Sequence, residues 1–250
     1  MALEAKNLTV GYSGRKVVSD INETLPESEL TVLIGANGSG KSTLLRTLTG
    51  AQVALVGSVE LDGRDIRSYK SVQLAKHLSL VLTDRIGGGG LSVEEIVSIG
   101  RHPYSGFLGR LSPHDREIVK AAIELVGLQH KAKSFVASLS DGERQKAMIA
   151  RAIAQDTELI VLDEPTSFLD VSSRFEIMDL LSRLTREEHK TVLLSTHDIA
   201  PALSVAGNIW AIANGHLNAG TAEQLKDSGV LDSVYRGVEF DAAANDFRRK

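Results

Sequence analysis

The chain has 250 residues, of which 42% are hydrophobic and 24% charged, a composition typical of a globular protein and too apolar for intrinsic disorder. Its 28 basic and 32 acidic residues give a formal charge of −4, which argues against binding nucleic acid through bulk positive charge, and the lack of cysteine excludes disulfide frameworks, cysteine-ligated metals and thiol catalysis. The first residues do not form a secretory signal and no window approaches the ~18 apolar residues of a membrane span, so we expect a cytoplasmic chain that acts at a membrane only through a partner.

In chain order, the first expected elements are short strands with turns, at residues 8–10 and, around Asp62-Gly63, at residues 59–66. Three continuously apolar runs stop abruptly at small or polar residues; they are residues 31–34, 159–162 and 191–194. Because these runs do not alternate with polar residues, we predict strands buried on both faces, as in a parallel sheet covered by helices. Ligands bind just beyond the carboxyl ends of such strands, so the polar residues there are the first candidates for a site.

Helices are expected between the strands. One begins near Thr43, and Ile177 to Leu184 gives another a core-facing stripe. The stretch from about residue 84 to 154 changes character and is predicted to be helical, with capping-box starts at Ser92 and Ser112 and a helix stop at Gly127. The sequence therefore indicates an α/β core that carries an inserted helical subdomain.

The strongest motif is a P-loop at residues 35–43, which lies between an expected strand and an expected helix, as this motif requires. Its glycines let backbone N–H groups surround phosphate oxygens, and the helix N-terminus adds partial positive charge. Lys41 can reach the β- and γ-phosphates, and the Ser42 hydroxyl can ligate Mg²⁺. The residues assigned to nucleotide binding here are Gly35, Ala36, Asn37, Gly38, Ser39, Gly40, Lys41, Ser42 and Thr43.

Polar residues at the ends of the other two runs suggest how a bound nucleotide is hydrolysed. Asp163 can hold Mg²⁺ directly or through water. Glu164 is then free to orient or deprotonate water at the γ-phosphate, which makes it the candidate general base. In the alternative interpretation the two acids only cap the next helix. His197 is a candidate catalytic contact to the γ-phosphate, although a lone histidine is more often bonded to backbone.

Residues 139–145, Leu-Ser-Asp-Gly-Glu-Arg-Gln, contain a third capping box, between Ser140 and Glu143. The plain interpretation is a well-formed helix start. A helix N-terminus where Gly142 permits close approach is also an anion site.

Together, the P-loop, the Leu-Ser-x-Gly-Glu signature, Leu-Asp-Glu-Pro at 162–165 and Ser-Thr-His-Asp at 195–198 resemble the ATP-binding subunits of ABC transporters, over residues 3 to 221. The resemblance implies that Tyr12 stacks on adenine and that Asp170, in the D-loop, helps to align two subunits. The resemblance also implies that the signature closes over ATP held by the P-loop of a second copy. The signature residues that would contact this ATP are Ser140, Asp141, Gly142 and Glu143. One P-loop and one signature then imply a homodimer with two composite ATP sites, with ATP and Mg²⁺ as cofactors.

A finer resemblance lies in the predicted helical region. Gly-Arg-His-Pro-Tyr at 100–104, Gly109-Arg110 and residues 142–145 are similar to the importers of ferric siderophores, haem and vitamin B12. The alternative is that Arg101 and Arg110 belong to a solvated face and Pro103 marks a helix end.

Two residues depart from the family pattern. Asp141 stands where the family usually has glycine, so its carboxylate must point away from phosphate or weaken that contact by charge repulsion. Thr83 stands after the strand at 78–82, where the Q-loop glutamine is expected, and its hydroxyl would reach Mg²⁺ or its water less easily.

The expected fold is α/β: a P-loop NTPase core with a mostly parallel sheet, flanking helices and an N-terminal antiparallel β part, plus the helical subdomain at about 84–154. We expect one ABC ATPase domain over residues 1–221 and a C-terminal helix and tail over residues 222–250. The last residues, 239–250, are predicted to be a frayed end.

The implied function is ATP hydrolysis that energises import of an iron chelate, haem or cobalamin-type ligand. Implied partners are two transmembrane permease subunits and, through them, an extracytoplasmic substrate-binding protein, with no nucleic acid. The ATPase would lie peripherally on the cytoplasmic face of the inner membrane. The alternatives are the ATPase of another ABC transporter such as an exporter, a soluble ABC ATPase acting on DNA or ribosomes, and a small-molecule kinase. The soluble class usually carries two cassettes or a long coiled-coil arm, and a kinase has no reason to contain residues 139–145.

Overall fold

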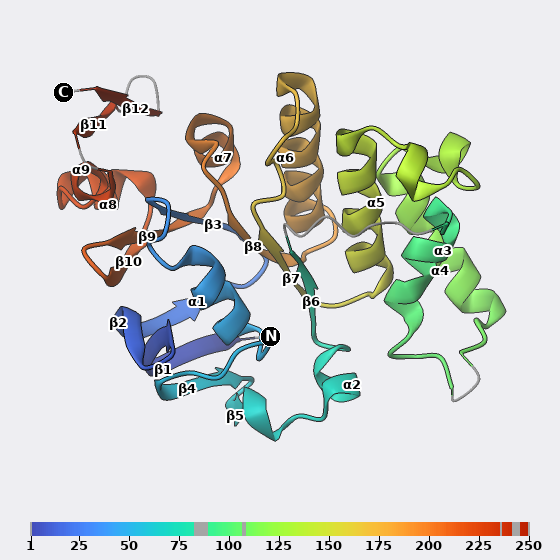
Figure 1. The fold of residues 1–250 in the computed structure, drawn as a ribbon, viewed down its shortest axis with the longest axis horizontal. Helices are drawn as coiled ribbons and strands as arrows, with labels where there is room; N and C mark the ends of the chain where they lie inside the picture. The colour runs from blue at the N-terminus through green and yellow to red at the C-terminus, as the bar shows by residue number, and fades with distance from the viewer. Residues whose placement is uncertain (1, 83–89, 107–108, 236, 242–245, 250) are drawn as a thin grey trace.

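The computed structural model describes residues 2–82, 90–106, 109–235, 237–241 and 246–249 (Figure 1). Over these residues a sheet runs in the order β5-β4-β1-β2-β10-β9-β3-β8-β7-β6. Its strands are β1 Leu3–Tyr12, β2 Arg15–Leu25, β3 Leu30–Gly35, β4 Val56–Leu61, β5 Arg64–Asp65, β6 Leu78–Val81, β7 Leu159–Asp163, β8 Thr191–Ser195, β9 Asn208–Ala213 and β10 His216–Gly220. The helices are α1 Lys41–Leu48, α2 Ser71–Leu74, α3 Val93–Ser98, α4 Pro113–Leu125, α5 Asp141–Ala154, α6 Val171–Arg186, α7 Ile199–Val205, α8 Ala222–Asp227 and α9 Leu231–Val234.

The sheet has a parallel part and an antiparallel part, as predicted. Strands β6, β7, β8, β3 and β9 pair parallel to one another in that order. Strands β1, β2, β4 and β5 pair antiparallel, and β10 pairs antiparallel with β9. A single parallel bridge between His216 of β10 and Ser19 of β2 joins the two parts.

The predicted apolar runs form β3, β7 and β8, which are buried on both faces. Successive side chains of a strand point to opposite faces, so each run contributes to two cores. In β3, Val32 and Ile34 belong to the core that includes α3 to α7, whereas Leu33 belongs to the core of α1 and the antiparallel strands. In Figure 1, α1 accordingly lies on the opposite side of the sheet from α6 and α7. Buried on both sides, these strands fix the positions of the loops that follow them.

Helices α3, α4 and α5 pack on one another beyond β6, at one end of the sheet (Figure 1). Each begins with the predicted serine cap and capping box, at Ser92, Ser112 and Ser140. No helix in the described ranges is long and apolar enough to span a membrane.

Arg101 does not belong to a solvated face. It ends a 3-10 turn, Ile99–Arg101, and is only 4% exposed. Its guanidinium donates to Asp115 Oδ1 and to the carbonyl of Ala154, at 2.9 Å each, and lies 3.9 Å from the ring centre of Tyr104. These bonds of Arg101 therefore connect the segment after α3 to the start of α4 and the end of α5.

The C-terminal tail is not a frayed end over its described residues. After α8 and α9 the chain forms an antiparallel hairpin of β11, Val238–Asp241, and β12, Asp246–Arg249. Phe240 and Phe247 pack edge to face with ring centroids 5.3 Å apart, and both are partly buried against the larger core. This burial of aromatic surface explains why a charged, polar tail is ordered here.

Candidate active site

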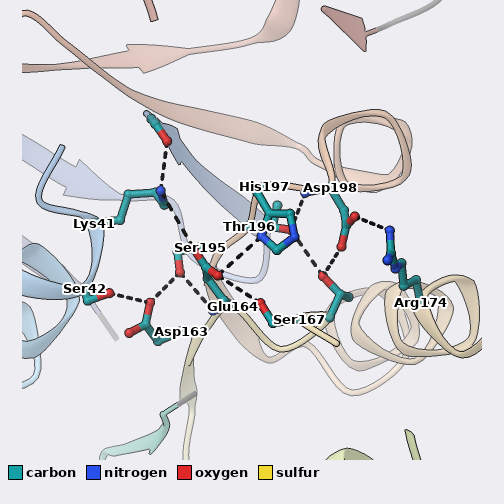
Figure 2. Close-up of polar contacts among 12 residues, drawn as sticks. Lys41, Ser42, Asp163, Glu164, Ser167, Arg174, Ser195, Thr196, His197 and Asp198 are labelled. Carbon is teal, nitrogen blue, oxygen red and sulfur yellow. Dashed lines mark hydrogen bonds and ion pairs between the residues drawn. The ribbon is translucent and has the colours of Figure 1, made fainter. Parts of the chain in front are cut away.

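The loops after β3, β7 and β8 meet at one edge of the sheet and bring the predicted polar residues together (Figure 2). The parallel arrangement places the three carboxyl ends side by side, which is where ligands bind in such sheets. The residues brought together there are Lys41, Ser42, Asp163, Glu164, Ser195 and His197.

The P-loop turns sharply before α1, which begins at Lys41. Gly38 and Gly40 have φ angles of 75° and 106°, in the region where a side chain is strained. The Lys41 side chain is 6% exposed, and its ammonium donates to the carbonyl of Gly35 at 2.8 Å, with Glu164 Oε1 at 3.9 Å. Burial lowers the pKa of Lys41, and the carboxylates of Glu164 and Asp163 partly oppose that shift. The lysine is thus a buried cation held against loop carbonyls.

Asp163 ends β7 and is 4% exposed. Its Oδ1 accepts hydrogen bonds from Ser195 Oγ at 2.7 Å and from Ser42 Oγ at 3.1 Å. A carboxylate beside a P-loop hydroxyl is the oxygen donor set that Mg²⁺ prefers, with phosphate and water completing its coordination. No group of three or more acidic or histidine side chains in the described ranges has metal-binding geometry.

Glu164 adopts a φ of 48°, and its N–H donates to the Ser195 hydroxyl at 3.0 Å and to the Ser195 carbonyl at 3.1 Å. The left-handed backbone costs free energy, which these bonds offset. Its Oε2 accepts from Ser167 Oγ at 2.9 Å and lies 3.3 Å from Nδ1 of His197. The carboxylate is thus held between His197 and Lys41, as Figure 2 shows. The two carboxylates have different partners, so neither serves only as a helix cap.

A polar network next to His197 was not predicted from the sequence. Asp198 accepts from Thr166 Oγ1 at 2.6 Å and from the guanidinium of Arg174, at the start of α6, at 2.7 Å. Its N–H donates to Thr196 Oγ1 at 3.0 Å. These bonds fix the loop that carries His197. Asp198 lies in the quoted Ser-Thr-His-Asp stretch, but its partners are distant in sequence.

Tyr12 lies at the end of β1, is 57% exposed and borders the P-loop. It lines a groove of about 220 Å³ with Gly38, Lys41 and Glu164. An adjoining cavity of about 500 Å³ is lined by Tyr12, Arg15, Lys16, Asn214 and P-loop residues. The sequence did not predict three of these lining residues, Arg15, Lys16 and Asn214. Their nearness to strand ends is the only signal that could have indicated them. The position of Tyr12 is compatible with the predicted adenine contact.

The signature residues lie at the start of α5. Ser140 and Glu143 form a reciprocal capping box, and Glu143 also pairs with Lys131, which holds the pKa of its carboxyl below the usual range. Asp141 pairs with Arg144 one turn along its own helix, at 2.7 Å. Among the described residues, no hydrogen bond or ion pair joins these four to the P-loop of the same chain.

Asp170 and Thr83 complete the predicted set. Asp170 is the N-cap of α6, accepting from the Ser173 N–H at 2.8 Å. Ser173 also faces the signature, because a Cβ on Gly142 would lie 2.7 Å from its Oγ. Thr83 falls outside the described residues, so its predicted role stays a prediction.

The chain is similar to known proteins over most of its length. The model of the ABC transporter family matches residues 18–167. The iron(3+)-hydroxamate import ATP-binding protein FhuC of Bacillus subtilis is 37% identical over 236 residues, covering 94% of this chain and 88% of that protein. The ferric enterobactin transport ATP-binding protein FepC of Escherichia coli is 35% identical, covering 93% of this chain and 86% of that protein. A solved dimeric bacterial ABC transporter cassette is 26% identical with a TM-score of 0.74, covering 88% of this chain and 98% of that one. The chain therefore belongs to the ABC transporter family, as an ATP-binding subunit with ATPase activity.

Proposed function

We propose that this chain energises an ABC importer of ferric siderophores or related iron chelates. The observation that carries the proposal is the convergence of Lys41, Asp163 and Glu164 at one sheet edge. It occurs in a chain whose relatives FhuC and FepC are named for iron(3+)-hydroxamate import and ferric enterobactin transport. A kinase would not need the signature helix, and no observation favours an exporter.

Each residue of the site has its own role in ATP hydrolysis. Lys41, whose ammonium donates to the Gly35 carbonyl, pairs with the β- and γ-phosphates through its remaining N–H donors. Ser42 and Asp163 would hold Mg²⁺, which would supply charge neutralisation at those phosphates. Glu164 accepts a proton from, or orients, the attacking water. His197 positions Glu164 through their 3.3 Å contact and faces the γ-phosphate.

The working unit in this proposal is a homodimer with two composite sites. The side chains of Ser140 to Glu143 have their partners on α5 itself and on Lys131 nearby, and none contacts the P-loop of the same chain across the described residues, so the helix start is available to a nucleotide on a second copy. Asp170 and Ser173 lie beside Gly142, where the two copies would align. One ATPase domain, residues 1–221 with its helical subdomain at about 84–154, would be followed by the C-terminal segment.

The partners follow from this function. Two permease subunits would carry the cargo, with an extracytoplasmic substrate-binding protein delivering it. The ATPase dimer would lie peripherally on the cytoplasmic face of the membrane.

The test is uptake of radiolabelled ferric hydroxamate by cells that lack this chain and are complemented with variants. Wild type should restore uptake and Lys41→Ala should not. Lys120→Ala is the matched control, because Lys120 lies on the surface of α4 and, among the described residues, its ion pair is with Glu124. Restored ATPase activity without restored uptake of any iron chelate would overturn the cargo while leaving the ATPase intact.

A further inference from the structure

The loop between α4 and α5 brings a cation to the helix that begins with the signature. Gly127, two residues after the end of α4, has a φ of 75°, as is common where a helix ends, and a 3-10 turn, Gln129–Lys131, follows. The N–H of Glu94, at the start of α3, donates to the Ala132 carbonyl of this loop at 2.9 Å. The loop is therefore fixed to the neighbouring helix, and so is the cation that it carries.

That cation is the ammonium of Lys131, which donates to one carboxylate oxygen of Glu143 in the first turn of α5. The two side chains are 35% and 25% exposed, so water screens the pair only in part. The other carboxylate oxygen of Glu143 accepts from the Ser140 N–H at 3.1 Å. The contact with Lys131 lowers the pKa of the Glu143 carboxyl, which is therefore ionised at neutral pH.

The first turn of α5 is acidic, although it is expected to meet phosphate. Asp141 and Glu143 contribute two negative charges there, whereas the helix dipole contributes roughly half a positive charge. The triphosphate of a bound ATP is itself an anion and would be repelled. Two cations offset the acids: Arg144 pairs with Asp141 at 2.7 Å, and Lys131 pairs with Glu143. The helix start is therefore close to neutral only while both cations are in place.

The two cations differ in where they come from. Arg144 belongs to α5 and also donates to the Leu139 carbonyl at 3.0 Å, so changing it would disturb the helix start as well as the charge. Lys131 lies outside the helix, twelve positions before its partner in the chain. It can therefore be changed while the capping bonds of α5 stay intact.

We propose that Lys131 is a positioning residue for the composite ATP site, which neutralises Glu143 and so lets the start of α5 approach the triphosphate held by a second copy. The inference rests on the proposed homodimer. Lys131 acts through Glu143 and needs no contact of its own with ATP. Among the described residues, no hydrogen bond or ion pair joins this pair to the P-loop of the same chain. Lys131 should therefore affect the association of two copies and not ATP binding by one.

The main variant is Lys131→Gln, which removes the charge and keeps a polar side chain. The measurement is ATPase activity per chain against protein concentration, because a site shared by two chains becomes active only as they associate. The concentration that gives half-maximal activity, the association midpoint, should rise about three- to tenfold, the effect of one partly screened charge near phosphate. The Kd of the single chain, measured with a fluorescent ATP analogue below that midpoint, should be unchanged.

Two variants of the same loop are controls for this measurement. Lys131→Arg keeps the positive charge beside Glu143, so its association midpoint should match that of wild type. Lys133→Gln removes a charge from an exposed lysine of the same loop that has no ion pair among the described residues, so it should not shift the midpoint. A shifted midpoint in Lys131→Arg, or a raised Kd for the single chain in Lys131→Gln, would assign Lys131 a role in folding or in the P-loop site and overturn the proposal.

A second substitution distinguishes neutralisation of Glu143 from direct contact with ATP. Glu143→Gln removes the carboxylate charge and retains the capping box, which accepts glutamine at this position. In that background, Lys131→Gln should shift the association midpoint no further, because no charge is left to neutralise. A shift of equal size in both backgrounds would mean that Lys131 itself contacts ATP or the second copy, and would overturn the proposal.

The remaining outcomes separate this inference from the proposed homodimer. If wild-type activity per chain depends on protein concentration and Lys131→Gln leaves the midpoint unchanged, only the role of Lys131 is wrong. If wild-type activity per chain does not depend on concentration and Ser140→Arg hydrolyses ATP normally, the homodimer is wrong and this inference fails with it.

Discussion

The P-loop edge of the sheet and the start of α5 are both built to meet phosphate, but their polar groups are used differently. At the sheet edge, side chains from distant segments contact one another: Lys41 pairs with Glu164, and Ser42 and Ser195 donate to Asp163. At the start of α5, Ser140 and Glu143 bond within four residues of sequence, on an exposed helix end.

This difference shows which part of the site one chain assembles alone. The sheet edge depends on long-range packing, and its charged groups are oriented before any ligand arrives. The helix start has its capping bonds within four residues, and Glu143 pairs with the nearby Lys131; across the described residues it makes no polar contact with the sheet edge. Mutations at the sheet edge should therefore impair ATP hydrolysis by groups of one chain. Mutations at the start of α5 should impair the approach of a second chain to the bound ATP.

The largest effect is expected for Glu164→Gln. Glutamine keeps the size and the contacts to Ser167 and His197 but cannot take a proton, so ATP hydrolysis should fall by about 10²–10⁴, the usual contribution of a general base. Mg-ATP binding should persist, and an ATP-bound dimer should become visible by gel filtration. Turnover near the wild-type rate would transfer the role of base to His197.

Ser140→Arg tests the start of α5, where a second copy is expected to approach. The bulky cation would block approach of a second copy, so hydrolysis should fall about 10- to 100-fold, with each lost factor of ten equivalent to about 1.4 kcal/mol of transition-state contact. ATP binding to the monomer, followed by calorimetry, should be nearly unchanged. Ser138→Arg, two residues earlier on an exposed turn, is the matched control. Normal hydrolysis in Ser140→Arg would mean that one chain contains the whole site.

Asp115→Asn should affect folding of the helical part and spare the sheet edge. The Ser112 hydroxyl and amide, together with Arg101, lower the pKa of the Asp115 carboxyl from 3.8 to about 2. A lowered pKa contributes stability that is present above about pH 3.8 and is lost as the pH falls toward 2. The variant should melt at a lower temperature at pH 7, because Arg101 loses its buried partner, and its stability should vary less between pH 4 and 2. An unchanged slope in that window would assign the acid sensitivity to other carboxyls.

Local patterns predicted the parts of this molecule that depend on neighbouring residues. The apolar runs that became β3, β7 and β8, and the serine caps of α3, α4 and α5, are short-range signals that tertiary structure preserved. The P-loop and the two acids followed from the same logic, because parallel strands must end at one edge.

Long-range pairing was not visible in the sequence. Strand β2 mixes charged and apolar residues because one side of the antiparallel part is exposed, so no continuous run marked it. The ion pair between Arg174 and Asp198 joins residues 24 positions apart in the chain, and neither residue has a motif that names the other. The C-terminal hairpin is held by packing of Phe240 and Phe247, which a strand pattern of four residues cannot signal.

The smallest expected effect concerns Asp141, where the two regions would meet across a dimer. Its carboxylate is 50% exposed and is held by Arg144, so its charge is directed toward its own helix and partly neutralised. Residual repulsion with the triphosphate of a second copy should still slow closure. Asp141→Asn keeps the shape and removes the charge, and its ATPase activity should rise about two- to fivefold at low salt, an effect of about 1 kcal/mol or less.

Salt provides the control for that prediction. Repulsion between partly exposed charges is screened over about 8 Å at physiological ionic strength and about 3 Å at 1 M, so the gain in Asp141→Asn should shrink as salt is added. Glycine at 141 removes the charge and the helix-start preference together, so Asp141→Gly should show the same ATPase gain with a lower melting temperature. A gain that persists at 1 M salt would mean that Asp141 slows closure by its size or its bond to Arg144, and that charge is not the reason for this departure from the family pattern.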